Sequence, residues 1–268
     1  MILLIKAIKK LFILVFGVVF VFLANGTVEI GFVSQKIEAF KERGVLVSID
    51  DGIPENHYYR VEPIHGYEDV SRPVFNVEDR LIGSKTDIIV TNRNPMRDHK
   101  NIGWATGFLA KAFYLGHATL NADDEGTEMF EVIGNGASAA DNEVSLASND
   151  WITYEEWLGV DGVSPMIVGL RVKNTTEEQR NQTVAYAEAQ IGKPYNFSFI
   201  FNRNNSYYCT DLVSRAFSSA GINVNYDYFA TTGNDLISSR EVYVIFIRET
   251  VVVAGIKQYN IYYLSNGE

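Results

Sequence analysis

The chain has 268 residues, of which 47% are hydrophobic and 13% aromatic. That length and composition allow one sizeable core, or one domain with a small annex, and exclude wholesale disorder. The formal net charge is −10. An acidic chain without a cluster of basic residues is a poor partner for nucleic acid, so we expect no nucleic-acid binding.

Residues 1–26 have the composition of an export segment. Its positive charges come from three lysines: Lys6, Lys9 and Lys10. The apolar run 11–23 follows, and then the small residues 24–26. This order is typical of a secretory signal peptide, and the run is short for a spanning helix, which needs about 20 apolar residues. We therefore predict a secreted or extracytoplasmic protein with a cleaved leader. Because residues 2–5 are apolar too, an uncleaved N-terminal membrane anchor is the alternative.

Cys209 is the only cysteine, so the chain cannot form an internal disulfide. Exported folds usually use cysteines in pairs, and a single leftover thiol is either reactive or linked to another molecule. One cysteine and four scattered histidines show no ligand spacing for zinc, so we expect no metal and no other cofactor.

Residues 27–80 carry mixed signals. Residues 34–43 suggest a short helix and residues 44–49 a strand, whereas the polar, proline-containing stretch 50–76 predicts a loop. We treat residues 27–80 as an N-terminal extension, which is either a small annex or one edge of the main fold.

Residues 81–268 form the predicted main domain. Short apolar runs predict strands at residues 87–90, 117–120, 129–133, 166–172, 241–247 and 250–254, with 259–264 as a further candidate. A capping box of Thr175 and Glu178 begins one helix, which Gly192 ends. A second helix begins around Cys209 and ends at Gly221. The sum is an α+β fold with a mainly antiparallel sheet packed against helices.

Cys209 is a candidate nucleophile because it lies at the predicted start of a helix. The helix dipole and the free N–H groups of a first turn lower the pKa of a thiol, and only the thiolate attacks. The backbone N–H of Cys209 would then also serve as an oxyanion donor during acyl transfer.

His117 is the candidate base. The other three histidines, His57, His65 and His99, lie in predicted loops, whereas His117 follows a glycine on a predicted strand. A third polar group must orient the imidazole, and Glu131 interrupts the next apolar strand. Structural interpretations stay open at this point: Cys209 as an inert small hydrophobe, His117 as a hydrogen-bonded core residue, and Glu131 on a solvated strand face.

Five segments together resemble the YiiX-like branch of the NlpC superfamily. They are GHATL at residues 116–120, AQIGKPYNF at 189–197, YCTDLV at 208–213, NDLISS at 234–239 and DIIV at 87–90. In that branch the histidine strand precedes the cysteine helix, because the fold is circularly permuted relative to papain. The same order occurs here, and the resemblance covers residues 81 to about 247.

This resemblance implies a permuted papain-like, NlpC-type fold and assigns roles. Cys209 would be the nucleophile, His117 the general base and then acid, and Glu131 the orienting residue, while Tyr208 would line the cleft. The third role is the least constrained, because the superfamily varies this residue. Three acidic neighbours compete for it: Asp123, Asp124 and Glu128.

The implied function is an exported thiol hydrolase that cleaves an amide, such as one in a cell-wall peptide, through an acyl-enzyme. One alternative is a lipid-directed cysteine hydrolase or acyltransferase, which an aromatic slot of Phe197, Phe199, Phe201 and Tyr207 would favour; ordinary core packing also explains that run. The other alternative is a non-catalytic surface binding protein on the same scaffold. The expected partners are a peptide, amide or lipid substrate and, through the N-terminal segment, a membrane.

Overall fold

A computed structural model describes residues 2–50, 52, 54–93, 114, 116–134, 142–153, 165–198, 205–226 and 230–266. Its centre is a nine-stranded sheet in the order β1-β2-β11-β10-β9-β5-β6-β7-β8. The strands are β1 (Gly44–Asp50), β2 (Glu55–Val61), β5 (Ile88–Thr91), β6 (His117–Asn121), β7 (Glu128–Val132), β8 (Val144–Ser148), β9 (Ile167–Val172), β10 (Val242–Val253) and β11 (Ile256–Leu264), and the short strands β3 (Phe75–Asn76) and β4 (Leu81–Ile82) pair separately.

Neighbouring strands of the large sheet are antiparallel except for β2 and β11, which run parallel. The strands β5 and β9, in the middle of the sheet, are buried along their whole length. Such continuous apolar runs are expected where both faces of a sheet are covered. The predicted α+β class with a mainly antiparallel sheet is confirmed.

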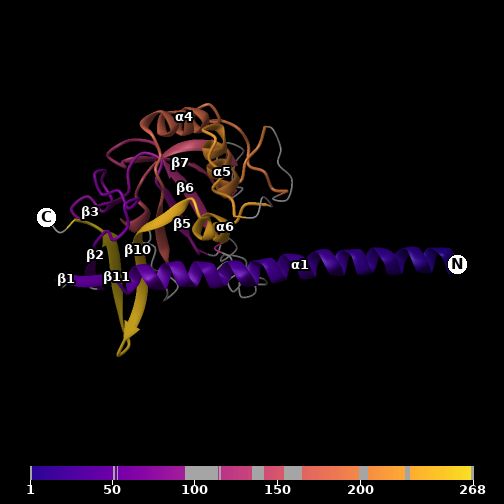
Figure 1. The fold of residues 1–268 in the computed structure, drawn as a ribbon, viewed down its shortest axis with the longest axis horizontal. Coiled ribbons are helices and arrows are strands. Elements are labelled where there is room, and N and C mark those ends of the chain that lie inside the picture. Colours follow the sequence, from indigo (N-terminus) through magenta and orange to yellow (C-terminus); the bar gives the residue numbers. More distant parts are fainter. Residues whose placement is uncertain are drawn as a thin grey trace.

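The helices are α1 (Ile2–Lys41), α4 (Glu177–Glu188), α5 (Cys209–Ser219) and α6 (Gly233–Ser238). Helix α5 contacts β6 and β7, towards the β8 edge of the sheet, and α4 packs against α5. Helices α1 and α6 contact each other and β10 (Figure 1). The start of α5 therefore lies over the strands that carry His117 and Glu131.

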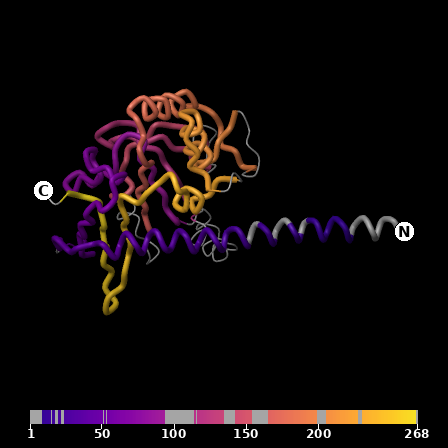
Figure 2. The backbone as a smooth tube through the Cα atoms, in the orientation of Figure 1, coloured from indigo at the N-terminus to yellow at the C-terminus, as the bar shows by residue number. Residues whose placement is uncertain are grey.

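Helix α1 runs unbroken from Ile2 to Lys41, so the helix predicted at residues 34–43 is only the end of a much longer one. Figures 1 and 2 show the C-terminal part of α1 beside the domain and the N-terminal part projecting from it. Over the described part of the chain, no helix combines the length and the apolar character needed to cross a membrane.

The prediction of a loop at residues 50–76 is wrong in part, because β2 lies within this stretch. Strand β2 is rich in polar residues, but Tyr58 and Val61 are buried and the strand pairs with both β1 and β11. Cross-strand pairing of this kind is not visible in a local apolar pattern. Strand β8 was missed for the same reason, since only Val144 of its five residues is fully buried.

The two strands predicted at residues 241–247 and 250–254 are one strand, β10. The charged residues between them suggested a break, but both charges have partners. Glu249 accepts a 2.8 Å ion pair from Lys41 of α1, and the guanidinium of Arg248 stacks 4.3 Å from the ring of Tyr259. Strand β10 therefore continues without a break through both charged residues.

The capping box of α4 lies one residue later than predicted. Thr176, not Thr175, is the N-cap, and its partner is Gln179 rather than Glu178. The hydroxyl of Thr176 accepts from the backbone N–H of Gln179 at 3.2 Å, and the Gln179 side chain accepts from the N–H of Thr176 at 3.0 Å. The two overlapping patterns satisfy the same rule, so the sequence alone could not separate them.

Candidate active site

Cys209 is the first residue of α5, as predicted. At this position its backbone N–H has no acceptor within the helix, which leaves it available to another group. Cys209 is partly buried, and its sulfur accepts hydrogen bonds from the backbone N–H groups of Ala118 and Thr210 and also hydrogen-bonds the side chain of His117. Three donors therefore converge on one sulfur atom.

His117 begins β6, where the backbone is held close to β5. Gly116 makes this approach possible, because a Cβ atom at that position would lie 2.2 Å from the carbonyl oxygen of Thr91. The imidazole Nε2 lies 2.9 Å from Oε2 of Glu131, which leaves Nδ1 as the nitrogen available to the Cys209 thiol. The Trp151 ring packs 5.4 Å from the imidazole, centroid to centroid.

Glu131 reaches His117 because of the register between β6 and β7. Leu120 is opposite Phe130, so the register continues to Thr119 opposite Glu131. Side chains two residues apart on a strand share a face, and diagonal neighbours across an antiparallel pair are within reach of long side chains. The structure thus brings Cys209, His117 and Glu131 together in one hydrogen-bonded series.

The electrostatics of the series favour separated charges. Burial alone would raise the pKa of Cys209, but the hydrogen bond and positive charge of His117, with the two backbone N–H groups, lower it. Burial alone would lower the pKa of His117, but its bonds to Cys209 and Glu131 and their negative charge raise it to about 9. Both shifts favour a thiolate beside an imidazolium over the neutral pair.

The three acidic residues that compete with Glu131 for the orienting role do not lie in this series. Glu128 is exposed at the start of β7. Asp123 accepts hydrogen bonds from the backbone N–H groups of Thr127 and Glu128 in the β6–β7 turn. Asp124 is exposed and lies 3.6 Å from the Lys85 ammonium.

Tyr208 precedes the nucleophile candidate and is 5% exposed. Its hydroxyl accepts a hydrogen bond from the backbone N–H of Thr231, and burial raises its pKa. Its role in lining a substrate cleft stays a prediction. Sequence reasoning missed Tyr195, whose ring packs over Gly134 and whose pKa is raised by burial and then by the nearby charge of Cys209. The signal for it was its place in the GKPYNF segment.

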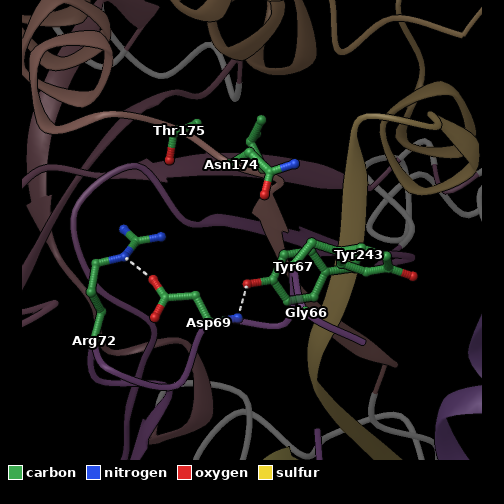
Figure 3. Close-up of a pocket in the computed structure, with 8 residues that line it drawn as sticks. Gly66, Tyr67, Asp69, Arg72, Asn174, Thr175 and Tyr243 are labelled. Carbon is green, nitrogen blue, oxygen red and sulfur yellow. Dashed lines mark hydrogen bonds and ion pairs between the residues drawn. The ribbon is translucent and has the colours of Figure 1, made fainter. Parts of the chain in front are cut away.

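A pocket of about 210 Å³ opens elsewhere on the domain (Figure 3). Its walls come from the segment after β2, from the end of β9 and the residues that follow it, and from β10: Gly66, Tyr67, Asp69, Arg72, Val172, Asn174, Thr175 and Tyr243. The charged groups in it already pair, since Arg72 Nε donates to Asp69 at 3.0 Å, and the Tyr243 hydroxyl accepts from the Asp69 N–H at 2.9 Å. The pocket contains none of the predicted site residues.

His57 and His65 lie apart from Cys209. His57 is on β2, contrary to the predicted loop, and pairs with Glu55 at 2.9 Å. His65 stacks on Tyr67 in the turn after β2, and His99 is outside the described residues. Within the described ranges, no three His, Cys, Asp or Glu side chains are grouped so that they could hold a metal ion.

Comparison with known proteins places this site in a family. Residues 113–255, more than half of the chain, match the family described as permuted papain-like amidase enzyme, YaeF/YiiX, C92 family. The chain belongs to this family. The predicted YiiX-like resemblance is thus confirmed, and the protein is an enzyme of the cysteine peptidase or amidase type. The alternative of a non-catalytic binding protein does not agree with this membership.

Among solved structures, the crystal structure of the metalloprotein YiiX from Escherichia coli O157:H7 is similar to this chain. The similarity covers 60% of this chain and 96% of that one, with 18% sequence identity and a TM-score of 0.42. A search of curated proteins found no match.

Proposed function

We propose that this member of the permuted papain-like amidase family cleaves an amide bond through an acyl-enzyme. Cys209 is the nucleophile, His117 is the base and then the acid, and Glu131 orients the imidazole. The observation that carries the proposal is the hydrogen-bonded series from the Cys209 sulfur through His117 to the Glu131 carboxylate at the start of α5. A nucleophile, a base and an orienting group in contact are what this chemistry requires.

The first half of the reaction forms a thioester. The Cys209 thiolate attacks the carbonyl carbon of the substrate, and the new oxyanion is stabilised by the free backbone N–H of Cys209. The C–N bond then breaks, and the His117 imidazolium donates its proton to the leaving nitrogen. The products of this half are an amine and an S-acyl enzyme.

The second half restores the enzyme. Neutral His117 takes a proton from water, and the resulting hydroxide attacks the thioester carbon. The S–C bond breaks, a carboxylic acid leaves, and the thiolate–imidazolium pair forms again. Glu131 accepts from Nε2 of the ring throughout, which keeps Nδ1 directed at the sulfur.

For the substrate we propose an extracytoplasmic amide, such as a bond in a cell-wall peptide. A lipid-directed hydrolase or acyltransferase is the second candidate, because Phe197 is 59% exposed and packs 4.8 Å from the ring of Tyr195 beside Cys209. Tyr207 does not contribute to such a slot, since it is fully buried. Phe199 and Phe201 lie outside the described residues.

The decisive test is the rate of Cys209 alkylation by iodoacetamide as a function of pH, in the wild type and in His117→Ala. We expect the wild-type thiol to react as a thiolate well below the ordinary cysteine pKa of about 8.5. In His117→Ala the profile should move up towards or above that value, because the imidazolium no longer lowers the pKa. An ordinary wild-type profile, unchanged in the variant, would contradict the proposal.

Substrate class is tested by offering wall-derived peptides and acyl lipids to the wild type and to Cys209→Ala. Release of an amine from the peptides by the wild type alone supports the amidase. Turnover confined to acyl lipids would replace it with the second candidate. Substitution of Phe197 by Ser should lower only the lipid reaction, because this exposed ring is the feature on which that candidate rests.

A further inference from the structure

Helix α1 has two parts with different surroundings. The C-terminal part presents a buried stripe to the domain at i, i+3 and i+4 spacing: Gly26, Glu29, Val33, Ile37 and Phe40. Lys36 lies beside this stripe, and its ammonium donates to the carbonyl oxygens of Ile237 at 2.8 Å and Ser239 at 2.5 Å. These carbonyls end α6, so a cation there also complements the helix dipole.

The N-terminal part of α1 carries large apolar side chains that are exposed, at 61–72% of their surface. Those described are Leu11, Phe12, Ile13, Leu14, Phe16, Phe20 and Val21. At 100° per residue they occupy every side of the helix rather than one stripe. Figure 1 shows this part of α1 extending beyond the domain.

The predicted cleavage site lies inside the continuous helix. Ala24 is exposed, but Gly26 is buried. The Asn25 side-chain amide donates to the carboxylate of Glu29, which is itself buried. Proteolysis is favoured in exposed, irregular segments, whereas residues 24–26 are helical and begin the docked stripe. This arrangement favours retention of residues 1–26 over their removal.

An apolar surface around a whole helix suits lipid better than a second copy of the chain. A partner helix covers one stripe and leaves the opposite side in water, whereas acyl chains surround a helix completely. The charges agree with this choice, because the exposed residues Lys9 and Lys10 precede the apolar run and match anionic headgroups. The 13-residue run 11–23 is about 20 Å long as a helix, which is less than a hydrocarbon core of about 30 Å.

We propose that the N-terminal part of α1 is retained and inserts into a lipid bilayer, so that the catalytic domain is held at a membrane surface. Insertion here does not require that the helix cross the bilayer. The docked stripe and Lys36 join the inserted part rigidly to α6 and β10, so the membrane also orients the domain. The proposal does not depend on the catalytic roles of Cys209 and His117.

The test is flotation of the purified full chain with vesicles of phosphatidylcholine and phosphatidylglycerol. The wild type should float, and the double variant Ile13→Asp/Phe16→Asp should bind at least about 100-fold more weakly, because a charged carboxylate in an apolar helix opposes insertion. Val45→Asp is the matched control, since Val45 is as exposed as Ile13, at 61%, but lies on β1. That variant should float like the wild type.

Several outcomes would overturn the proposal. One is a wild type that stays with the dense fraction, and another is equal loss of flotation in the Val45 control. A mature N-terminus near residue 26, found by intact-mass measurement after export, would show that the leader is cleaved. Wild-type dimers in sedimentation velocity that dissociate in the double variant, without flotation, would assign the surface to a second copy. Cys209 alkylation should be equal in all three proteins, which separates this test from that of the enzyme activity.

Discussion

Two pairs of interacting groups lie beside the central sheet and differ in how fully they are hydrogen-bonded. Arg171 on β9 and Asp87 before β5 are both 1% exposed, and two guanidinium nitrogens contact the carboxylate at 2.8 and 2.5 Å. Further bonds reach the backbone of Asp69 and Ser84. The second pair is Cys209 and His117, on α5 and β6.

The difference lies in what each pair can still do. Every nitrogen of Arg171 is occupied, and a guanidinium does not release its proton in proteins, so this pair holds strands and loops together. The imidazole of His117, by contrast, can give a proton and take one back, and Cys209 is only partly buried. A saturated charge pair stabilises, whereas an unsaturated pair with a movable proton can react.

The largest expected effect comes from removing the reactive group. Cys209→Ala should lower kcat/KM for amide hydrolysis by on the order of 10⁴-fold or more, because no other group can form the acyl-enzyme. The free energy of unfolding should change by less than about 1 kcal/mol, since the change removes one small atom from a partly buried residue. Progress curves on the purified variant and urea denaturation measure the two quantities. Residual hydrolysis near the wild-type rate would show that Cys209 is structural.

For Arg171 and Asp87 we expect the opposite result, a loss of stability without a change in the reactivity of Cys209. Asp87→Ala leaves the buried guanidinium of Arg171 without its counter-charge, which should cost about 3–5 kcal/mol of unfolding free energy. Urea denaturation measures this loss. In the fraction that remains folded, Cys209 alkylation should keep the wild-type pH profile, because the pair makes no contact with the reactive series.

The matched control for Asp87→Ala is the double variant Asp87→Ala/Arg171→Met. Replacing both charges of a buried pair is less costly than removing one, so the double variant should recover part of the lost stability. A double variant less stable than the single one would mean that Arg171 acts mainly through its bonds to the carbonyl groups of Asp69 and Pro73.

The members of the reactive series could be predicted from sequence, but the groups around them could not. One cysteine and four histidines leave few pairings, and the start of a helix is a local signal. Ala118 and Thr210 contribute through their backbone N–H groups, which any residue type carries. Trp151 reaches His117 from a segment beyond β8, and only the folded sheet brings the two rings together.

The fold, too, was predictable from sequence only in part. Strands β5 and β9 were predictable because apolar residues dominate both short segments. Strand β2 was not, since it is rich in polar residues and its parallel partner β11 comes from the other end of the chain. The six residues of α6 are all buried although half are polar, and a capping box of Thr232 and Asp235 begins the helix. Such a short element is defined by its surroundings rather than by a periodic pattern.

A smaller effect on activity is expected when the orienting carboxylate loses its charge. Glu131→Gln keeps the size of the side chain but no longer stabilises the imidazolium, so kcat/KM should fall by about 10- to 100-fold. Because Glu131 helps to raise the pKa of His117 to about 9, the alkaline limb of the pH–rate profile should move to lower pH. Glu128→Gln, on the exposed start of the same strand, is the control and should change neither quantity. An equal loss in both variants would remove Glu131 from the series.

The smallest effect concerns the support behind His117. Trp151 is buried, and its indole Nε1–H donates to the hydroxyl of Thr119 at 3.3 Å. Trp151→Phe keeps an aromatic ring beside the imidazole but loses this bond, which should lower the free energy of unfolding by about 1–2 kcal/mol. Thr119→Val loses the same bond from the other side, so the effects of the two changes should not add fully in the double variant. If kcat/KM of the fully folded variant falls as well as the free energy of unfolding, the indole N–H positions His117. If only the free energy of unfolding falls, the bond is a structural contact, like the pair of Arg171 and Asp87.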